Sequence, residues 1–159
     1  MIMKARIDYM TTDREAIQLL LGIERHVSRS GLEHKLLHLI KMRASQLNGC
    51  AYCLDMHSKD ARAEGETEQR LYSLDAWEES PYYSDRERAA LAWTEAITVL
   101  GNGHVPDSVY EKVRTQFNEK EIAALTLAAA MINTWNRLNV AFRTEAGGYR
   151  PGMFKNRSE

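Results

Sequence analysis

The chain has no long hydrophobic run, and this absence excludes the usual form of membrane anchor. No stretch of the 159 residues approaches the roughly 20 consecutive apolar residues that a membrane-spanning helix needs. The first eight residues, Met1 to Asp8, contain no apolar core followed by a small-residue cleavage site, so we expect no secretory signal. The sequence therefore predicts a cytoplasmic protein with no membrane partner.

An excess of charge of one sign is also missing. The 21 Lys and Arg residues are matched by 22 Asp and Glu residues, which gives a formal net charge of −1. Proteins that bind nucleic acid or anionic lipid normally gather basic side chains into a patch. Because the charges here are spread along the chain, we expect no nucleic-acid partner.

Proline and glycine are scarce, with three and nine residues, and they fall mainly between segments of helical periodicity. No segment alternates β-branched and polar residues as a half-buried strand does, and no repeat of 20 to 50 residues is visible. A chain of this length can bury one sizeable core. The sequence predicts a single all-α domain over residues 1–159, with about seven helices.

Capping signals and glycines place the expected helix boundaries. The helices are expected to begin at a capping box over Thr12 to Glu15, near Leu32, at Cys50, at Thr67, at a capping box over Ser84 to Glu87, at Asp107, and at Asn118 paired with Glu121. Expected stops are Asn48-Gly49, Gly65, the run after Leu100 and, for the last helix, Gly147-Gly148. The tail from Tyr149 either frays or lies on a partner subunit.

Three asparagines recur at three-residue spacing on the last expected helix. Asn133, Asn136 and Asn139 therefore share one face of that helix. Amide side chains in such a row either form a polar seam with another helix or subunit, or line a pocket.

The chain has only two cysteines, Cys50 and Cys53, and they lie three residues apart. In a reducing compartment such a pair is more often catalytic, redox-sensing or metal-binding than a structural staple. A helix that ends at Gly49 puts Cys50 near the N-cap of the next helix and Cys53 in its first turn. Unpaired N–H groups and the helix dipole stabilise a thiolate there. His57 follows on the same helical face.

Several chemistries are open to this pair. A thioredoxin-like motif would follow a strand, and no strand is expected before Cys50. A c-type haem site would need His directly after Cys53, where this chain has Leu54. Structural zinc would need a fourth ligand beside Cys50, Cys53 and His57, such as His38 or a partner's residue. An inert buried pair is a further alternative. Redox chemistry fits best: a thiolate attacks a peroxide or a disulfide, the second thiol resolves the product, and an external dithiol restores the pair. A protonated His57 could act as general acid.

The segment from Lys41 to His57, with Ser-Gln-Leu-Asn-Gly before Cys-Ala-Tyr-Cys and His four residues after the second cysteine, resembles the alkylhydroperoxidase AhpD family. That family belongs to the carboxymuconolactone decarboxylase superfamily, and the similarity extends over most of the chain. The resemblance implies an all-helical homo-oligomer, a trimer or hexamer, that reduces hydroperoxides without metal or bound cofactor. It also implies that Cys53 attacks the peroxide, that Cys50 resolves and meets the reductant, and that the reductant is a dithiol or lipoyl group.

The resemblance breaks at one position. The family usually has a glutamate twelve residues before the first cysteine, as a base beside the histidine that His57 matches, and this chain has His38 there. A neutral imidazole can accept a proton near pH 7, so His38 is kept as a candidate relay residue. Tyr52 is another candidate, either passing a proton or packing. The rival functions are decarboxylation of a γ-lactone acid and a non-catalytic redox-sensing module.

Overall fold

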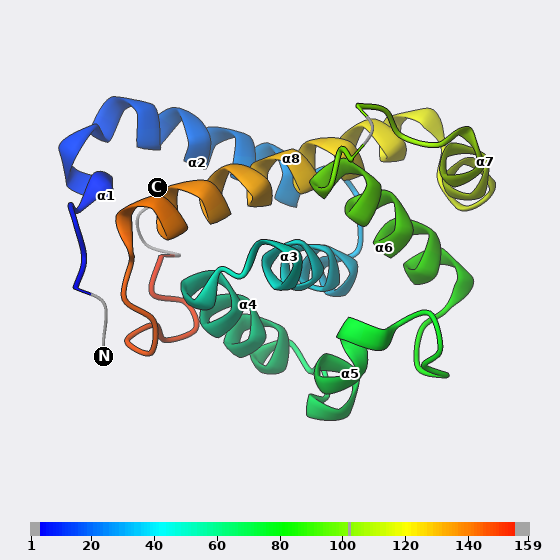
Figure 1. Ribbon diagram of the computed structural model, residues 1–159, viewed down its shortest axis with the longest axis horizontal. Helices are drawn as coiled ribbons and strands as arrows, with labels where there is room; N and C mark the ends of the chain where they lie inside the picture. The colour runs from blue at the N-terminus through cyan, green and yellow to red at the C-terminus, as the bar shows by residue number, and fades with distance from the viewer. Residues whose placement is uncertain (1–3, 102, 155–159) are drawn as a thin grey trace.

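The computed structural model describes residues 4–101 and 103–154, and within them the chain forms eight α-helices, one 3-10 turn and no strand (Figure 1). The elements are α1 (Tyr9–Thr12), α2 (Arg14–Ser28), α3 (His34–Asn48), α4 (Ala51–Ala63), α5 (Glu68–Ser73), η1 (Leu74–Ala76), α6 (Asp85–Thr98), α7 (Asp107–Gln116) and α8 (Glu119–Phe142). The all-α prediction is confirmed, with one helix more than expected. Of the described helices, none has the length and apolar content to cross a membrane.

Helix α3 lies at the centre of the molecule and packs on α4, α6 and α8. The long helix α8 runs between α2 on one side and the α3–α4 pair on the other, while α7 packs beyond α6 (Figure 1). The main core forms where α2, α3, α6, α7 and α8 meet, and residues such as Ile40, Leu125 and Ala128 are fully buried in it. A second cluster under α5 and η1 contains Leu39, Leu74 and Leu91. Burial of this apolar surface is the main force that holds the helices together.

Three predicted boundary signals are confirmed. Gly49 ends α3 in the left-handed conformation, with φ 63°, which glycine adopts without steric cost. Ser84 and Asn118 each form a reciprocal capping box, with Glu87 and Glu121 respectively. In both boxes the cap side chain accepts from the N–H of the third helical residue, and the Glu carboxylate accepts from the N–H of the cap.

Two predicted caps are wrong. Thr12 is the last residue of a short extra helix, α1, and its hydroxyl donates back to the carbonyl of Asp8 at 2.8 Å, so Asp13 caps α2 instead. Asp107 is already the first residue of α7, whose N-cap is Pro106 without a side-chain hydrogen bond. Proline suits the start of a helix, where N–H groups have no intrahelical acceptor.

The predicted ends of α6 and α8 are also wrong. Helix α6 stops at Thr98 rather than Leu100. Helix α8 stops at Phe142, not at Gly147-Gly148, because Arg143 takes the left-handed conformation with φ 56° and the chain turns there.

The segment after α8 turns back onto α4 of the same chain. The N–H of Gly147 donates to Asp55 at 3.1 Å, and the Tyr149 hydroxyl donates to Asp60 at 2.7 Å. Lys59 Nζ donates to the carbonyl of Tyr149 at 3.1 Å, so three side chains of α4 fasten this segment. The described part of the tail, up to Phe154, therefore folds against its own helix, and residues 155–159 lie outside the described part of the chain.

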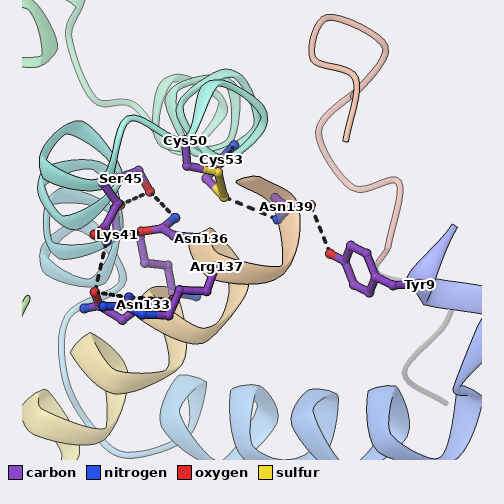
Figure 2. The surroundings of a disulfide bond; sticks show 10 residues. Tyr9, Lys41, Ser45, Cys50, Cys53, Asn133, Asn136, Arg137 and Asn139 are labelled. Atoms are coloured by element: carbon purple, nitrogen blue, oxygen red, sulfur yellow. Dashed lines mark hydrogen bonds between the residues drawn. A yellow bond between two sulfur atoms is a disulfide. The ribbon is translucent and has the colours of Figure 1, made fainter. Parts of the chain in front are cut away.

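The asparagine seam is confirmed and joins α8 to the turn between α3 and α4 (Figure 2). Asn48 Nδ2, at the end of α3, donates to Asn133 Oδ1 at 2.9 Å and to Asn136 Oδ1 at 2.8 Å. Asn136 Nδ2 donates to Ser45 Oγ at 3.0 Å, and Asn136 is completely buried. Because buried amides must find partners, this seam sets the rotation of α8 against α3.

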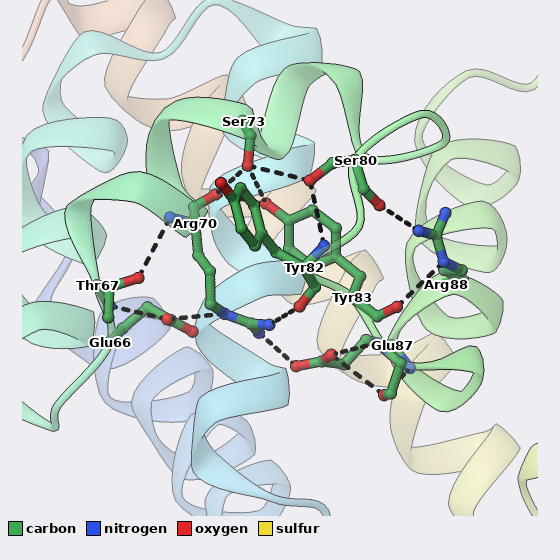
Figure 3. Close-up of polar contacts among 10 residues, drawn as sticks. Glu66, Thr67, Arg70, Ser73, Ser80, Tyr82, Tyr83, Glu87 and Arg88 are labelled. Carbon is green, nitrogen blue, oxygen red and sulfur yellow. Dashed lines mark hydrogen bonds and ion pairs between the residues drawn. The ribbon is translucent and has the colours of Figure 1, made fainter.

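Arg70 and Arg88 fasten the loop between η1 and α6 (Figure 3). Arg70 pairs with Glu66 at 2.9 Å and Glu87 at 2.5 Å, and its guanidinium lies over the Tyr83 ring. Arg88 donates to backbone carbonyls of the loop, including that of Trp77 at 2.9 Å. The side chain of Glu66 is only 5% exposed, so this ion pair is largely shielded from water.

We expect Asn136→Ala to lower the free energy of unfolding by about 2–3 kcal/mol, because it leaves buried partners on α3 unsatisfied. Urea denaturation measures this change. Thr134→Ala on the same helix is the matched control. Within the described residues the Thr134 hydroxyl donates to the carbonyl of Ala130 one turn earlier, so its loss should change the free energy by less than about 0.5 kcal/mol. A loss below about 1 kcal/mol for Asn136→Ala would contradict a fold-setting seam.

Candidate functional site

Cys50 and Cys53 form a disulfide at the start of α4, with their Cα atoms 5.4 Å apart. Cys50 is the N-cap of the helix, as predicted, and its Sγ accepts from the N–H of Cys53 at 3.4 Å. The N–H of Cys50 donates to the carbonyl of Ser45, which closes the Gly49 turn. The turn therefore places both sulfurs at the positive end of the α4 dipole.

Both cysteines are covered in the single chain, with 1% of Cys50 and none of Cys53 exposed. They form a small apolar cluster with Ala44 and Ile132, and the partly buried rings of Tyr52 and Trp135 pack against it. A hollow of about 820 Å³ lies between α6 and α7, and neither cysteine lines it. The side chains over the sulfurs must therefore move before another molecule can contact either sulfur.

His57 lies one turn after Cys53 on the same face of α4 and is buried. Burial holds the pKa of its imidazole well below the usual 6.5, and the nearby charges of Lys41 and His38 lower it further. The ring is therefore neutral at neutral pH. A neutral imidazole can take the proton of a neighbouring thiol, and only then has a proton to give.

His38 and Glu64 form a contact that joins α3 to the end of α4. His38 Nε2 lies 3.0 Å from Glu64 Oε2, while His38 Nδ1 is buried and finds no hydrogen-bond partner among the described residues. The Glu64 side chain is 36% exposed, so it connects this contact to solvent. The sequence did not single out Glu64, because its contact with His38 depends on how α4 packs on α3.

A second carboxylate approaches the site from α2. Glu24 pairs with Lys41 at 2.8 Å and accepts from the indole N–H of Trp135 at 3.0 Å. Both side chains of the ion pair are about four-fifths buried. Glu24 therefore offsets the charge of Lys41, whose field acts on His57.

Asn139 of α8 contacts the pair directly. Its Nδ2 donates to Cys53 Sγ at 3.4 Å, and its Oδ1 accepts from the Tyr9 hydroxyl at 3.0 Å (Figure 2). The spacing of the three asparagines indicated a seam, but nothing in the sequence pointed to Tyr9, 130 residues away.

Tyr52 lies between the two cysteines in sequence and is partly buried. Its phenol acts electrostatically on those of Tyr9 and Tyr149, so the three hydroxyl groups lie near one another. The structure thus places Cys50, Tyr52, Cys53 and His57 within the first two turns of α4, and His38 of α3 close enough to His57 to act on its pKa. Within residues 4–101 and 103–154, no three His, Cys, Asp or Glu side chains converge to hold a metal ion.

Residues 15–96 match the model of the carboxymuconolactone decarboxylase family. A crystal structure of an Agrobacterium tumefaciens protein of unknown function, provisionally assigned as the antioxidant defence protein AhpD, superposes with a TM-score of 0.88 at 43% identity, over 92% of this chain and all of that one. The chain is an AhpD-like member of the carboxymuconolactone decarboxylase family.

Three other proteins extend the comparison. The uncharacterized protein YdfG of Bacillus subtilis is 41% identical over 144 residues, which cover 91% of this chain and 98% of that protein. The uncharacterized protein YnjA of Escherichia coli is 28% identical over 76% of this chain and 65% of that one. The debrominase Bmp8 superposes over 87% of this chain and 75% of its own with a TM-score of 0.75, but at 19% identity this likeness shows the fold alone.

The lowered pKa of His57 predicts a pH-dependent stability. Between pH 6.5 and the lower folded-state pKa, the unfolded chain binds a proton that the folded chain does not, so acid favours unfolding. We expect the free energy of unfolding to be flat from pH 7.5 to 6.5 and then to fall by up to about 1.4 kcal/mol per pH unit. Urea denaturation of the oxidised protein at several pH values measures this slope.

His57→Gln should remove that slope, and His26→Gln, which changes an exposed histidine, should keep it. An unchanged slope in His57→Gln would show that another group takes up the proton.

Proposed function

We propose that this protein is a thiol-dependent hydroperoxide reductase that cycles through the Cys50–Cys53 disulfide. One observation carries the proposal: the pair is joined at a helix N-terminus, with the neutral base His57 one turn away. The helix start favours a thiolate, and the imidazole supplies a place for its proton. Membership of an AhpD-like family supports the same chemistry.

The proposed cycle begins with the reduced pair. His57 takes the proton of Cys53, and the Cys53 thiolate attacks one peroxide oxygen while the O–O bond breaks. Cys53 becomes a sulfenic acid, and the departing alkoxide takes a proton from His57. Cys50 then attacks the sulfenic sulfur, which forms the disulfide and releases water. The net reaction turns one hydroperoxide and two thiols into an alcohol, water and a disulfide.

An external dithiol completes the cycle. It supplies two electrons by thiol–disulfide exchange at the Cys50–Cys53 bond, and we propose a lipoyl group or a similar dithiol from the resemblance to the AhpD family. We propose from the same resemblance that the protein acts as a cytoplasmic homo-oligomer, a trimer or hexamer. Sedimentation velocity of the purified chain measures the number of subunits.

Oxidation of the reduced protein by one equivalent of tert-butyl hydroperoxide tests the cysteine roles. We expect rapid loss of both thiols and a mass decrease of about two daltons. Cys53→Ser should retain its single thiol, and Cys50→Ser should hold a sulfenic acid that a dimedone probe labels. Dihydrolipoamide should then sustain turnover of the parent protein only.

Each rival predicts a different result. Thiols that survive millimolar peroxide would refute a peroxidase. Oxidation without turnover by any dithiol would indicate a redox sensor. Decarboxylation of a γ-lactone acid that survives loss of both cysteines would indicate the reaction for which the family is named.

We further propose that His38 and Glu64 together receive the Cys53 proton from His57 and return it to His57 when the alkoxide departs, in place of the glutamate that the AhpD family usually carries at the position of His38. The buried Nδ1 of His38 and the 3.0 Å contact of its Nε2 with Glu64 support this route, since an imidazole can accept on one nitrogen and release from the other.

Glu64→Gln should slow the oxidation of Cys53 by peroxide about tenfold, and His38→Phe should slow it more, because proton transfer contributes about 10²-fold or more. Stopped-flow oxidation under single-turnover conditions measures both rates. Glu68→Gln, which removes an exposed ion pair with Arg62, is the control and should leave the rate unchanged. Equal rates in all four proteins would exclude this route.

A further inference from the structure

The two sulfurs of the pair receive hydrogen bonds from different sources. Cys50 Sγ accepts from the backbone N–H of Cys53, a contact within the first turn of α4. Cys53 Sγ accepts from the Asn139 side chain on α8, at 3.4 Å. The Cys53 sulfur belongs to a disulfide here, and in the reduced protein the same atom is a thiol or thiolate. A hydrogen-bond donor stabilises a thiolate more than it stabilises a disulfide sulfur, because hydrogen bonds to charged acceptors are stronger.

Complete burial makes a side-chain donor important at Cys53. Burial alone raises the pKa of a thiol, because the charged form loses its solvation. Cys53 is 0% exposed, so protein groups must supply the hydrogen bonds that water would otherwise donate to a thiolate. The other two asparagines of the seam direct their Nδ2 groups elsewhere: Asn133 to Thr98 and Asn136 to Ser45. Asn139 is thus the member of the seam whose Nδ2 donates to the Cys53 sulfur.

Tyr9 determines which end of the Asn139 amide faces Cys53. The Tyr9 hydroxyl donates to Asn139 Oδ1 at 3.0 Å, which leaves Nδ2 toward the sulfur. A flipped amide would direct an oxygen lone pair at the sulfur and would repel a thiolate. Burial raises the pKa of Tyr9 to about 12, so its hydroxyl keeps the proton that it donates.

Tyr9 is itself fastened to the end of α8. Its ring lies 5.7 Å from that of Phe142, and the N–H of Arg6 donates to the Phe142 carbonyl at 2.9 Å. The N-terminal segment therefore closes against the helix that carries Asn139. Figure 2 shows the resulting line from Tyr9 through Asn139 to Cys53.

We propose that Asn139 is a catalytic residue that stabilises the Cys53 thiolate in the reduced protein, and that Tyr9 is a positioning residue that holds the Asn139 amide in the donating orientation. The proposal rests on the proposed function only in taking Cys53 as the sulfur that reacts. It assigns a role in the site to the N-terminal segment, which the cysteine motif does not include.

Other titratable groups face the same region and stay unchanged in the variants of Tyr9 and Asn139. They are His57 and Tyr52 on α4, Lys41 and His38 on α3 with Glu24 from α2 against Lys41, and Tyr149 in the segment after α8. A shift of the Cys53 pKa in variants of Tyr9 or Asn139 therefore reports the loss of the donor.

The test measures the pKa of Cys53 in a Cys50→Ser background, where Cys53 is the sole thiol. The rate of alkylation by iodoacetamide between pH 5 and 10 gives this pKa without any peroxide. Asn139→Leu should raise it by about one unit, because the donor is lost. Asn139→Asp should raise it further through the added negative charge, and Tyr9→Phe should raise it by about half a unit while the ring packing on Phe142 remains.

Tyr149→Phe is the matched control, since it removes a neighbouring hydroxyl that donates to Asp60 rather than to the Asn139 amide. It should leave the pKa of Cys53 unchanged. The plateau rate at high pH should also stay the same in Tyr9→Phe, whereas a loosened fold would raise the rate at every pH.

The proposal is overturned if the pKa of Cys53 stays within about 0.3 units of the parent value in Tyr9→Phe and in every folded Asn139 variant, or if Tyr149→Phe shifts it equally. Should Asn139 variants fail to fold, Tyr9→Phe alone decides, because it removes one hydroxyl. Peroxide that leaves Cys53 unoxidised, with these pKa shifts intact, would refute the proposed function and leave the donor role standing.

Discussion

The rotation of α8 about its own axis is the constraint on which the rest of the structure depends. Asn133, Asn136 and Asn139 meet their partners only in one rotation, since neighbouring residues of a helix point about 100° apart. That rotation satisfies Ser45 and Asn48 at the end of α3, and it brings the Asn139 amide to Cys53. The apolar face of α8 supplies most of the stability, but apolar contacts tolerate small rotations and buried amides do not.

The same packing supplies the groups that would stabilise the thiolate that we propose at the buried pair of cysteines. The start of α4 offers N–H groups, and Asn139 offers a further neutral donor. Lys41 is paired with Glu24, and the pKa of His57 is held low, so neither presents an unpaired positive charge to the sulfurs at neutral pH. A thiolate in this setting is stabilised by dipoles rather than by a cation. Fixed dipoles need no rearrangement when the charge moves during the reaction.

Most of the fold and the centre of the site could be predicted from the sequence, because local geometry determines them. Cys50, Cys53 and His57 lie within eight residues, so helix geometry alone places them on one face of α4. The capping boxes at Ser84 and Asn118 are equally local. Tyr9 and Glu64 could not be found in this way, since each reaches the site only through tertiary packing. The prediction that Thr12 caps the next helix was wrong for a related reason, because Thr12 belongs to the extra helix α1 and its hydroxyl donates to the carbonyl of Asp8.

In the relay that we propose, the departure from the family motif at His38 leaves the chemistry of the motif in place. A proton relay needs a carboxylate at the right place and a path for the proton to reach it. Any position in the sequence can supply that carboxylate. Glu64 closes α4 and lies 3.0 Å from His38, so the packing of α4 on α3 returns a carboxylate to the neighbourhood of the position that lost one. The His38 imidazole has two ring nitrogens, so it can accept a proton on one and release a proton from the other. Its Nδ1 is buried in the protein, and its Nε2 lies at Glu64. The relay that we propose uses a histidine and an acid whose side chain is 36% exposed, so its outer end is in contact with solvent.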